Sequence, residues 1–332
     1  MPATLAADGL TAARHYGEIA ASGPHAVHMP GHICARVGMW QEDIEANAAS
    51  IAASQAAQAR HQSGAMDQFH SYDFLLYAYL QAGQDDRARS VLAETAAILT
   101  QFESMPGMGE DYMTGMMPFY RSKYPIFYDL ERRDWAAAAA REAPPGAPPE
   151  SQTLTYWARA IGAGHLHQPA ETRANLAKYQ SLIAQMRQGR HAYFADSTAA
   201  QIALGEMRGW VAFADGNSAE AIQHLREAAD LQDKVGQGEV DIPAREMLAD
   251  VMLESGQAKH ALVEYALALH LSPNRFNALF NAGRAAEAGG ERQRAKDYYA
   301  RLLQSTGNGS HSSRPEIQHA KDFQAQAATA EN

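Results

Sequence analysis

Residues 251–304 contain a repeat with a period of 34 residues. A glycine, an alanine and a tyrosine each recur at this interval, at Gly256 and Gly290, Ala261 and Ala295, and Tyr265 and Tyr299. A period of this length is typical of helix–turn–helix units, in which the glycine turns the chain and the alanine lets the two helices approach. Each unit packs mainly on its neighbours, so the core lengthens with the chain. We therefore expect an all-α protein built from αα-hairpins, without a β-sheet.

The same repeat, closed by Pro273 and Asn274, resembles the tetratricopeptide (TPR) repeat. That resemblance implies a superhelical solenoid of roughly six to seven helix pairs, whose concave face binds a peptide or protein partner. Candidate aromatic anchors on such a face are Tyr72, Tyr77, Tyr156 and Trp157. A TPR scaffold that binds a protein partner is the first functional expectation.

Weaker copies of the pattern divide the chain into four parts. Residues 1–22 read as a partial N-terminal helix, and 23–150 as degenerate TPR-like repeats with histidine motifs and a Met-rich loop. Residues 151–304 read as further repeats, and 305–332 as a spacer, a capping helix and a disordered tail. In the first degenerate repeat Gly38 takes the turn position, but Asp43 stands where a small alanine is expected. A long helix is expected over 192–215.

Composition excludes several classes of protein. The 332 residues carry a formal net charge of −10, which disfavours a nucleic-acid partner. The single cysteine, Cys34, excludes a disulfide within the chain and is expected to be a small buried residue. Neither a secretory signal nor an apolar run of the roughly 18 residues needed for a membrane span is visible. We expect a soluble, cytoplasmic protein, and the sequence does not predict its oligomeric state.

A histidine-rich segment, PHAVHMPGH, is the main candidate for chemistry. His28 and His32 are four residues apart, which places two imidazoles on one helix face. Pro30 is expected in the first turn of a helix that begins near Met29. One repeat later, the segment HSYD contributes His70 and Asp73.

Corresponding helices of neighbouring repeats lie side by side, so these four residues can meet on one wall. Three imidazoles and a carboxylate suit zinc, iron or copper. The alternative is that the histidines form hydrogen bonds between helices, because 14 histidines make chance clustering common. A metal-binding protein or metal-dependent enzyme is therefore the second functional expectation, and whether the chain is an enzyme is left open.

Other candidate sites are weaker. Five methionines between Met105 and Met117 could offer thioether ligands to Cu(I), although such residues more often fill irregular gaps. His165 and His167 are expected in a solvated turn. No HExxH motif is present, which disfavours a zincin-type protease.

The segments PHAVHMPGHICARVGMWQEDI, HSYDFLLYAYLQAGQDDRAR and DIPAREMLADVMLESGQAKHALVEYALALHLSPNRFNAL resemble a bacterial group of TPR-containing proteins. In that group an HMPSHI-like segment and a later H-x-x-D-Y-like segment recur, and the resemblance covers about residues 12–303. Longer members of the group carry a further histidine-bearing helix upstream. The resemblance implies that this chain lacks that helix. If the helix completes a site, the protein either lacks the site or is a truncated version.

Overall fold

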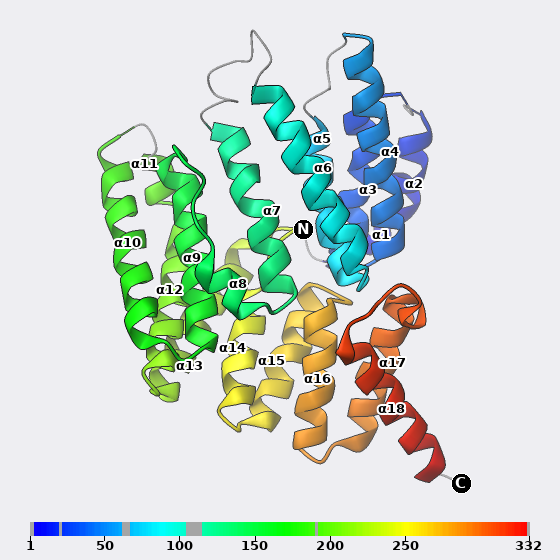
Figure 1. The fold of residues 1–332 in the computed structure, drawn as a ribbon. Helices are drawn as coiled ribbons and strands as arrows, with labels where there is room; N and C mark the ends of the chain where they lie inside the picture. The colour runs from blue at the N-terminus through cyan, green and yellow to red at the C-terminus, as the bar shows by residue number, and fades with distance from the viewer. Residues whose placement is uncertain (1–2, 20–21, 62–66, 104–114, 190–191, 331–332) are drawn as a thin grey trace. The chain divides into compact units, whose positions relative to one another are not determined.

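The computed structural model describes residues 3–19, 22–61, 67–103, 115–189 and 192–330, and all regular secondary structure within these ranges is helical (Figure 1). The prediction of an all-α chain without a sheet is confirmed for these ranges. The helices are α1 (Ala3–Asp8), α2 (Leu10–Ile19), α3 (Pro24–Val37), α4 (Trp40–Ala59), α5 (Asp67–Gln81), α6 (Asp85–Glu103), α7 (Met117–Glu131), α8 (Trp135–Ala140), α9 (Pro149–His165), α10 (Pro169–Arg187), α11 (Ala192–Ala195), α12 (Thr198–Ala214), α13 (Ser218–Val235), α14 (Ala244–Glu254), α15 (Ala258–Leu271), α16 (Phe276–Ala288), α17 (Arg292–Ser305), the 3₁₀ helix η2 (Gly307–Gly309) and α18 (Pro315–Ala330).

Most helices follow one another in pairs joined by a short turn that contains one residue with positive φ. Glycine suits this position because it has no Cβ to clash in the left-handed region. The residues with positive φ in these turns are Gly38, Gly83, Arg133, His167, Gly216, Gly256 and Gly290. Gly256 and Gly290, 34 residues apart, have φ values of 77° and 76°, so the repeated glycines make equivalent turns. Sequential helix-pair packing of this kind is consistent with a helical repeat, while a superhelical solenoid stays a prediction.

The recurring alanine and tyrosine of the repeat are core residues. Their side chains are fully buried at Ala261 and Ala295 and at Tyr265 and Tyr299. Tyr299 lies against Gly283 so closely that a Cβ on the glycine would be 2.4 Å from the tyrosine ring. The sequence interval therefore corresponds to equivalent packing positions in successive pairs.

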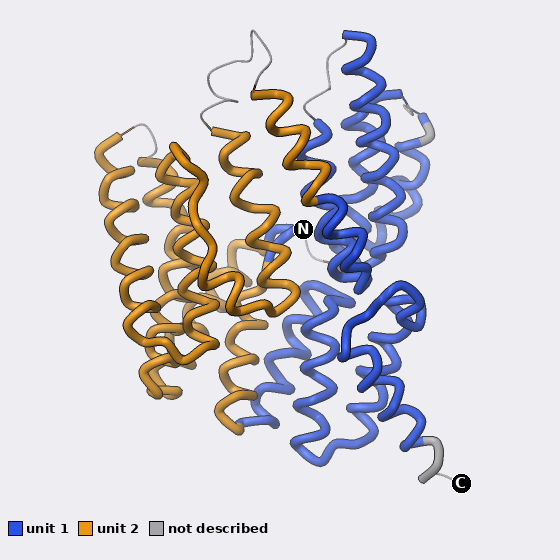
Figure 2. Tube along the Cα trace, viewed as in Figure 1, with its two compact units in different colours: residues 1–91, 238–241, 257–332 blue, residues 92–237, 242–256 orange. Residues whose placement is uncertain are grey.

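The chain forms two compact units (Figure 2). Unit 1 comprises residues 1–91, 238–241 and 257–332, and so combines both ends of the chain with a four-residue segment between α13 and α14. Inside this unit, Trp40 Nε1 donates to the carbonyl of Asn274 (2.7 Å), and the amide of Phe276 donates to Oε1 of Gln81 (3.0 Å). The N-terminal helices therefore pack on residues more than 190 positions away in sequence.

The start of α18 is fastened within unit 1 by a buried ion pair. The Arg314 guanidinium donates to both carboxylate oxygens of Asp85, at 2.7–3.1 Å, and lies 4.2 Å from the ring centroid of Phe276. Arg314 also donates to the carbonyl of Leu80 (3.1 Å), so its charge is well matched despite its burial. The expected last helix is present, and its first turn is anchored in the core.

Unit 2 comprises residues 92–237 and 242–256. In this unit α9 and α12 share a buried hydrogen bond, in which Trp157 Nε1 donates to Glu206 (2.7 Å). Arg133 makes two hydrogen bonds to the carboxylate of Asp250 (2.7 and 2.8 Å). The predicted divisions of the chain at 22, 150 and 304 follow the order of motifs and stay predictions.

Two predicted helix boundaries are wrong. The helix that carries His28 begins at Pro24, not near Met29, because Pro24 provides the preset φ of a first helical residue and Pro30 is accommodated inside α3. The helix expected over 192–215 is broken after Ala195, since the Ser197 side chain accepts from the amide of Ala200 (3.1 Å) and starts α12 as its N-cap. Among the described helices, none is both long enough and apolar enough to cross a membrane.

Candidate metal centre

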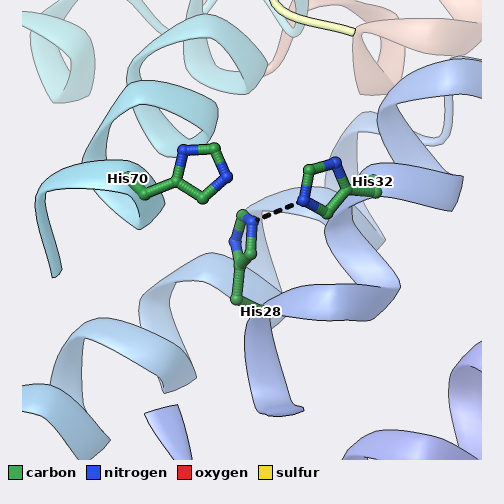
Figure 3. Close-up of side chains that lie close together, drawn as sticks. All are labelled: His28, His32 and His70. Atoms are coloured by element: carbon green, nitrogen blue, oxygen red, sulfur yellow. Dashed lines mark hydrogen bonds between the residues drawn. The ribbon is translucent and has the colours of Figure 1, made fainter. Parts of the chain in front are cut away.

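Helix α3 supplies the first two histidines of the site. Because α3 runs unbroken from Pro24 to Val37, His28 and His32 lie one turn apart on the same face. Their Nε2 atoms are 3.0 Å apart, as the dashed line in Figure 3 shows. The side chain of His32 retains 27 % of its exposure, whereas His28 is 1 % exposed. The pair therefore reaches from the interior towards solvent.

Helix α5 supplies the third histidine, His70, whose ring faces the other two (Figure 3). The ring centroids of His70 and His28 are 4.5 Å apart, and those of His70 and His32 are 5.5 Å apart. One ring nitrogen from each histidine lies within 4.8 Å of the other two. This partly buried group could hold a metal ion. Asp73, the fourth residue expected here, is buried on α5 and is not part of the group.

The protonation of His28 follows from the amide beside it. Asn47 Nδ2 donates to the main-chain carbonyl of Asp43 (2.9 Å) and to its Oδ1 (2.7 Å). A carbonyl can only accept, so the oxygen of the Asn47 amide must face His28. His28 Nδ1 therefore carries the proton and donates it to Asn47 Oδ1 (2.6 Å). The lone pair of Nε2 is left facing His32.

A glycine on α3 makes room for this arrangement. A Cβ at Gly31 would lie 2.7 Å from Asn47 Nδ2 and 2.9 Å from Asp43 Oδ1. Both side chains are completely buried. Gly31 on α3 therefore provides the space that the side chains of Asp43 and Asn47 on α4 require.

Burial sets the ionisation of the site. It lowers the pKa of His28 to about 3 and lowers that of His32, although the charge of Glu239 opposes the second shift. Burial also raises the pKa of Asp43 well above its ordinary value. Metal ions bind the neutral form of imidazole, so His28 is held in the ligating form at neutral pH.

Two residues beside the histidines escaped sequence reasoning. Asn47 lies on α4, seven residues after the glycine–tryptophan turn, and belongs to no motif. Glu239 lies between α13 and α14, with its Oε2 at 4.0 Å from His32 Nδ1 and its Oε1 at 3.0 Å from Arg36 Nη2. Burial alone would raise the pKa of Glu239, but the hydrogen bond and charge of Arg36 hold it below its usual value. Phe74 closes another side, with ring centroids 4.7–5.2 Å from the three imidazoles.

Three of the four proposed partner-binding aromatics are interior residues. Tyr72 and Tyr77 are each 2 % exposed, and Trp157, whose indole N–H donates to Glu206, is 6 % exposed. Tyr77 donates its hydroxyl proton to the carbonyl of Asp241 (3.0 Å). Tyr156 is partly exposed, with the cationic groups of Arg159 and Lys178 about 6 Å from its ring. The scaffold function stays a prediction, since only one of its named anchors presents surface to a partner.

The expectation of a solvated turn at His165 is wrong. Its side chain is 2 % exposed and stacks on Trp135, with ring centroids 3.7 Å apart and planes 8° from parallel. Trp210 lies on it at 4.1 Å, and His165 Nδ1 pairs with Glu254 Oε1 (3.1 Å). The close approach of Trp210 depends on Gly164, where a Cβ would lie 2.9 Å from the indole.

The remaining candidates are Cys34 and the methionines. Cys34 is buried, as expected, and burial raises the pKa of its thiol to about 12, which leaves it protonated. Of the methionines considered for Cu(I), Met105, Met108 and Met113 lie outside the described residues. Met117 is completely buried at the start of α7, preceded by the exposed Met116.

No model of a known protein family matches the chain, and a search of curated proteins finds no match either. The TPR identity and the resemblance to a bacterial TPR group therefore stay predictions. The sequential helix pairs and the group of three histidines rest on the structure alone.

Proposed function

We propose that the protein binds one divalent transition-metal ion through His28, His32 and His70. Metal–nitrogen bonds of about 2.0–2.1 Å in a tetrahedral site separate the ligand nitrogens by about 3.3 Å. The Nε2 atoms of His28 and His32, at 3.0 Å, need little movement to meet this requirement. One ring nitrogen of His70 is already within 4.8 Å of one nitrogen of each of the other two, so an approach of about 1.5 Å by His70 would complete the set. The convergence of these three nitrogens is the observation that carries the proposal.

The ligand set suggests the use of the ion. Three imidazoles suit zinc, iron or copper, and none adds negative charge that would weaken the ion as a Lewis acid. Structural zinc sites are closed by four protein ligands, whereas catalytic sites have three and keep one position for water. The partial exposure of His32 gives solvent a route to that position. We therefore favour zinc with a bound water, and hydrolysis by a metal-bound hydroxide as the reaction class.

A hydrogen-bonded histidine group without metal is the competing interpretation. It accounts for the contact between His28 and His32, because one Nε2 can donate to the other. Metal binding differs in that one nitrogen from each ring, that of His70 included, would have the same role.

The test is a metal titration of chelator-treated protein. We expect one Zn²⁺ or Co²⁺ per chain, and each of His28→Ala, His32→Ala and His70→Ala should weaken binding by more than about 100-fold, since a lost ligand exceeds the 10–100-fold effect of an outer residue. His260→Ala, which removes an exposed imidazole on α15, is the matched control and should bind as wild type does. A wild-type protein that takes up no metal would refute the proposal.

The open coordination position has its own measurement. Azide or thiocyanate added to the Co²⁺ form should change its visible ligand-field bands, because these anions replace a bound water. A spectrum indifferent to both anions would indicate a closed site and would exclude the hydrolytic role.

A further inference from the structure

The segment 238–241 is held in place by its last carbonyl. The oxygen of Asp241 accepts hydrogen bonds from the Tyr77 hydroxyl (3.0 Å) and from Arg275 Nη1 (3.0 Å). Arg275 is completely buried and also donates to the Tyr77 hydroxyl oxygen. Tyr77 comes from α5, the helix that carries His70. The segment is thus fastened to an element of the histidine site.

Glu239 stands two residues before that anchor and faces two different groups. Its Oε1 accepts from Arg36 Nη2 (3.0 Å), and its Oε2 is 4.0 Å from Nδ1 of His32. Nδ1 is the ring nitrogen on the far side from His28, whose partner on His32 is Nε2. Glu239 therefore lies behind the ligand and not among the ligating atoms.

The position of Glu239 matters because of where the protons lie on His28 and His32. His28 Nδ1 holds the proton that it donates to Asn47, so His28 Nε2 can only accept. In the metal-free protein the contact of 3.0 Å then requires the proton of His32 to be on Nε2. A metal ion needs the lone pairs of both Nε2 atoms. His32 must therefore move its proton to Nδ1, the nitrogen that faces the Glu239 carboxylate.

We propose that Glu239 is a positioning residue of the metal centre. Its carboxylate accepts a hydrogen bond from the protonated Nδ1 of His32 and so leaves the lone pair of His32 Nε2 for the metal. The inference rests on the proposed metal-binding function. It makes the metal site depend on a segment about 200 residues from the α3 histidines, presented by the contacts of Tyr77 and Arg275. Carboxylates that fix a histidine tautomer in this way are a common outer layer of metal sites.

Glu239→Gln is the sharpest test because it reverses the preference. Arg36 can only donate, so the oxygen of the new amide faces Arg36 and its NH₂ group faces His32 Nδ1. The amide then favours the tautomer with the proton on Nε2. We expect Zn²⁺ affinity, measured by competition with a chromophoric chelator, to fall about 10–100-fold. Glu239→Asp, which keeps the carboxylate, should recover part of the loss.

Glu287→Gln is the matched control. Glu287 also pairs with a histidine, His319 (2.8 Å), in the same unit, but no other histidine of the described ranges joins that pair. Its removal should leave Zn²⁺ affinity unchanged. ¹⁵N NMR of labelled wild-type protein supplies a direct readout, since the protonated nitrogen of His32 should change from Nε2 to Nδ1 when Zn²⁺ is added.

The outcomes separate the two proposals. If wild-type protein binds no Zn²⁺, both fail. If wild type binds Zn²⁺ but Glu239→Gln binds it equally well, Glu239 has no positioning role and the metal centre stands. Tyr77→Phe covers the case of a poorly folded Glu239 variant: it loosens the segment, and we expect a weaker effect on Zn²⁺ affinity in the same direction. A folded Tyr77→Phe protein that binds Zn²⁺ as tightly as wild type, and shows the same His32 tautomer as wild type, would likewise overturn the inference.

Discussion

Two buried histidine environments in this protein differ in what their rings face. In unit 1, His28 meets His32 and His70 through ring edges, and their nitrogens converge. In unit 2, His165 presents its flat face to Trp135 and lies against Trp210, while its Nδ1 pairs with a single carboxylate, that of Glu254. In the first arrangement ring nitrogens of three histidines lie close together, and in the second the histidine ring is stacked on a tryptophan.

The comparison shows that a shifted pKa does not by itself mark a functional histidine. Burial lowers the pKa of both His28 and His165. The two histidines differ in what their second ring nitrogen faces. A metal ligand needs a lone pair directed at neighbours that also offer lone pairs, as His28 Nε2 is. Desolvation and stacking are sufficient reasons for a core histidine.

The largest expected difference between the two environments is the response to metal. Zinc at 100 times its dissociation constant should raise the free energy of unfolding by about 2.7 kcal/mol, because it binds only the folded protein. Denaturant unfolding with and without zinc should show this increase in wild type and in His165→Phe, and should lose it in His28→Ala. An equal increase in His28→Ala would place the metal elsewhere.

The two glycines that admit these side chains should separate stability from binding. Alanine at Gly31 would press on Asn47 and Asp43, and alanine at Gly164 would press on Trp210, so each substitution should cost about 2 kcal/mol of stability from overpacking. Gly31→Ala should also weaken zinc binding, since it displaces the partner of His28. Gly164→Ala should leave zinc affinity unchanged. Matched losses of stability with unequal zinc affinity are the expected result; equal affinities would contradict the role assigned to Gly31.

The hydrogen-bond partners of the two histidines should differ in the same sense. Asn47→Ala removes the acceptor that holds the proton of His28 on Nδ1, and we expect zinc affinity to fall at least about tenfold, or 1.4 kcal/mol. Glu254→Gln removes the carboxylate partner of His165 and should not alter zinc affinity. Calorimetric titration of both variants measures this. Unchanged affinity in Asn47→Ala would show that His28 orients itself without the amide.

The smallest effect is the pH dependence of stability due to His165. Burial lowers its pKa in the folded state below the unfolded value near 6.5, so the unfolded chain binds a proton more readily. Stability should therefore fall as pH decreases below about 6.5, by less than about 1.4 kcal/mol per pH unit from this group. His165→Phe keeps the stacking and removes the titration, so its stability should fall less than that of wild type between pH 7 and 5.5. Urea unfolding at both pH values measures the difference, and identical losses would contradict the assignment.

Local features of this fold could be predicted from the sequence because they depend on residues close together in the chain. Glycine without a Cβ turns the chain at Gly256 and Gly290, and the four-residue spacing of His28 and His32 suffices to put both on one face of a helix. The place of His70 beside the other two histidines followed from the side-by-side helices of a repeat. Proline misled the prediction of the start of α3, because an interior Pro30 is tolerated after Pro24 has begun the helix.

Tertiary structure alone decided which side chains surround each histidine. Periodicity specifies the face of a helix but not the residue opposite it, so neither the amide of Asn47 nor the carboxylate of Glu239 could be assigned to the site. The same limit turned His165 from an expected solvated residue into a core residue between two tryptophans. The sequence determined the helical fold class, the glycine turns and the shared helix face of His28 and His32. The packing of α4 against α3 determined the proton position on His28, because hydrogen bonds within about 3 Å depend on how separate elements meet.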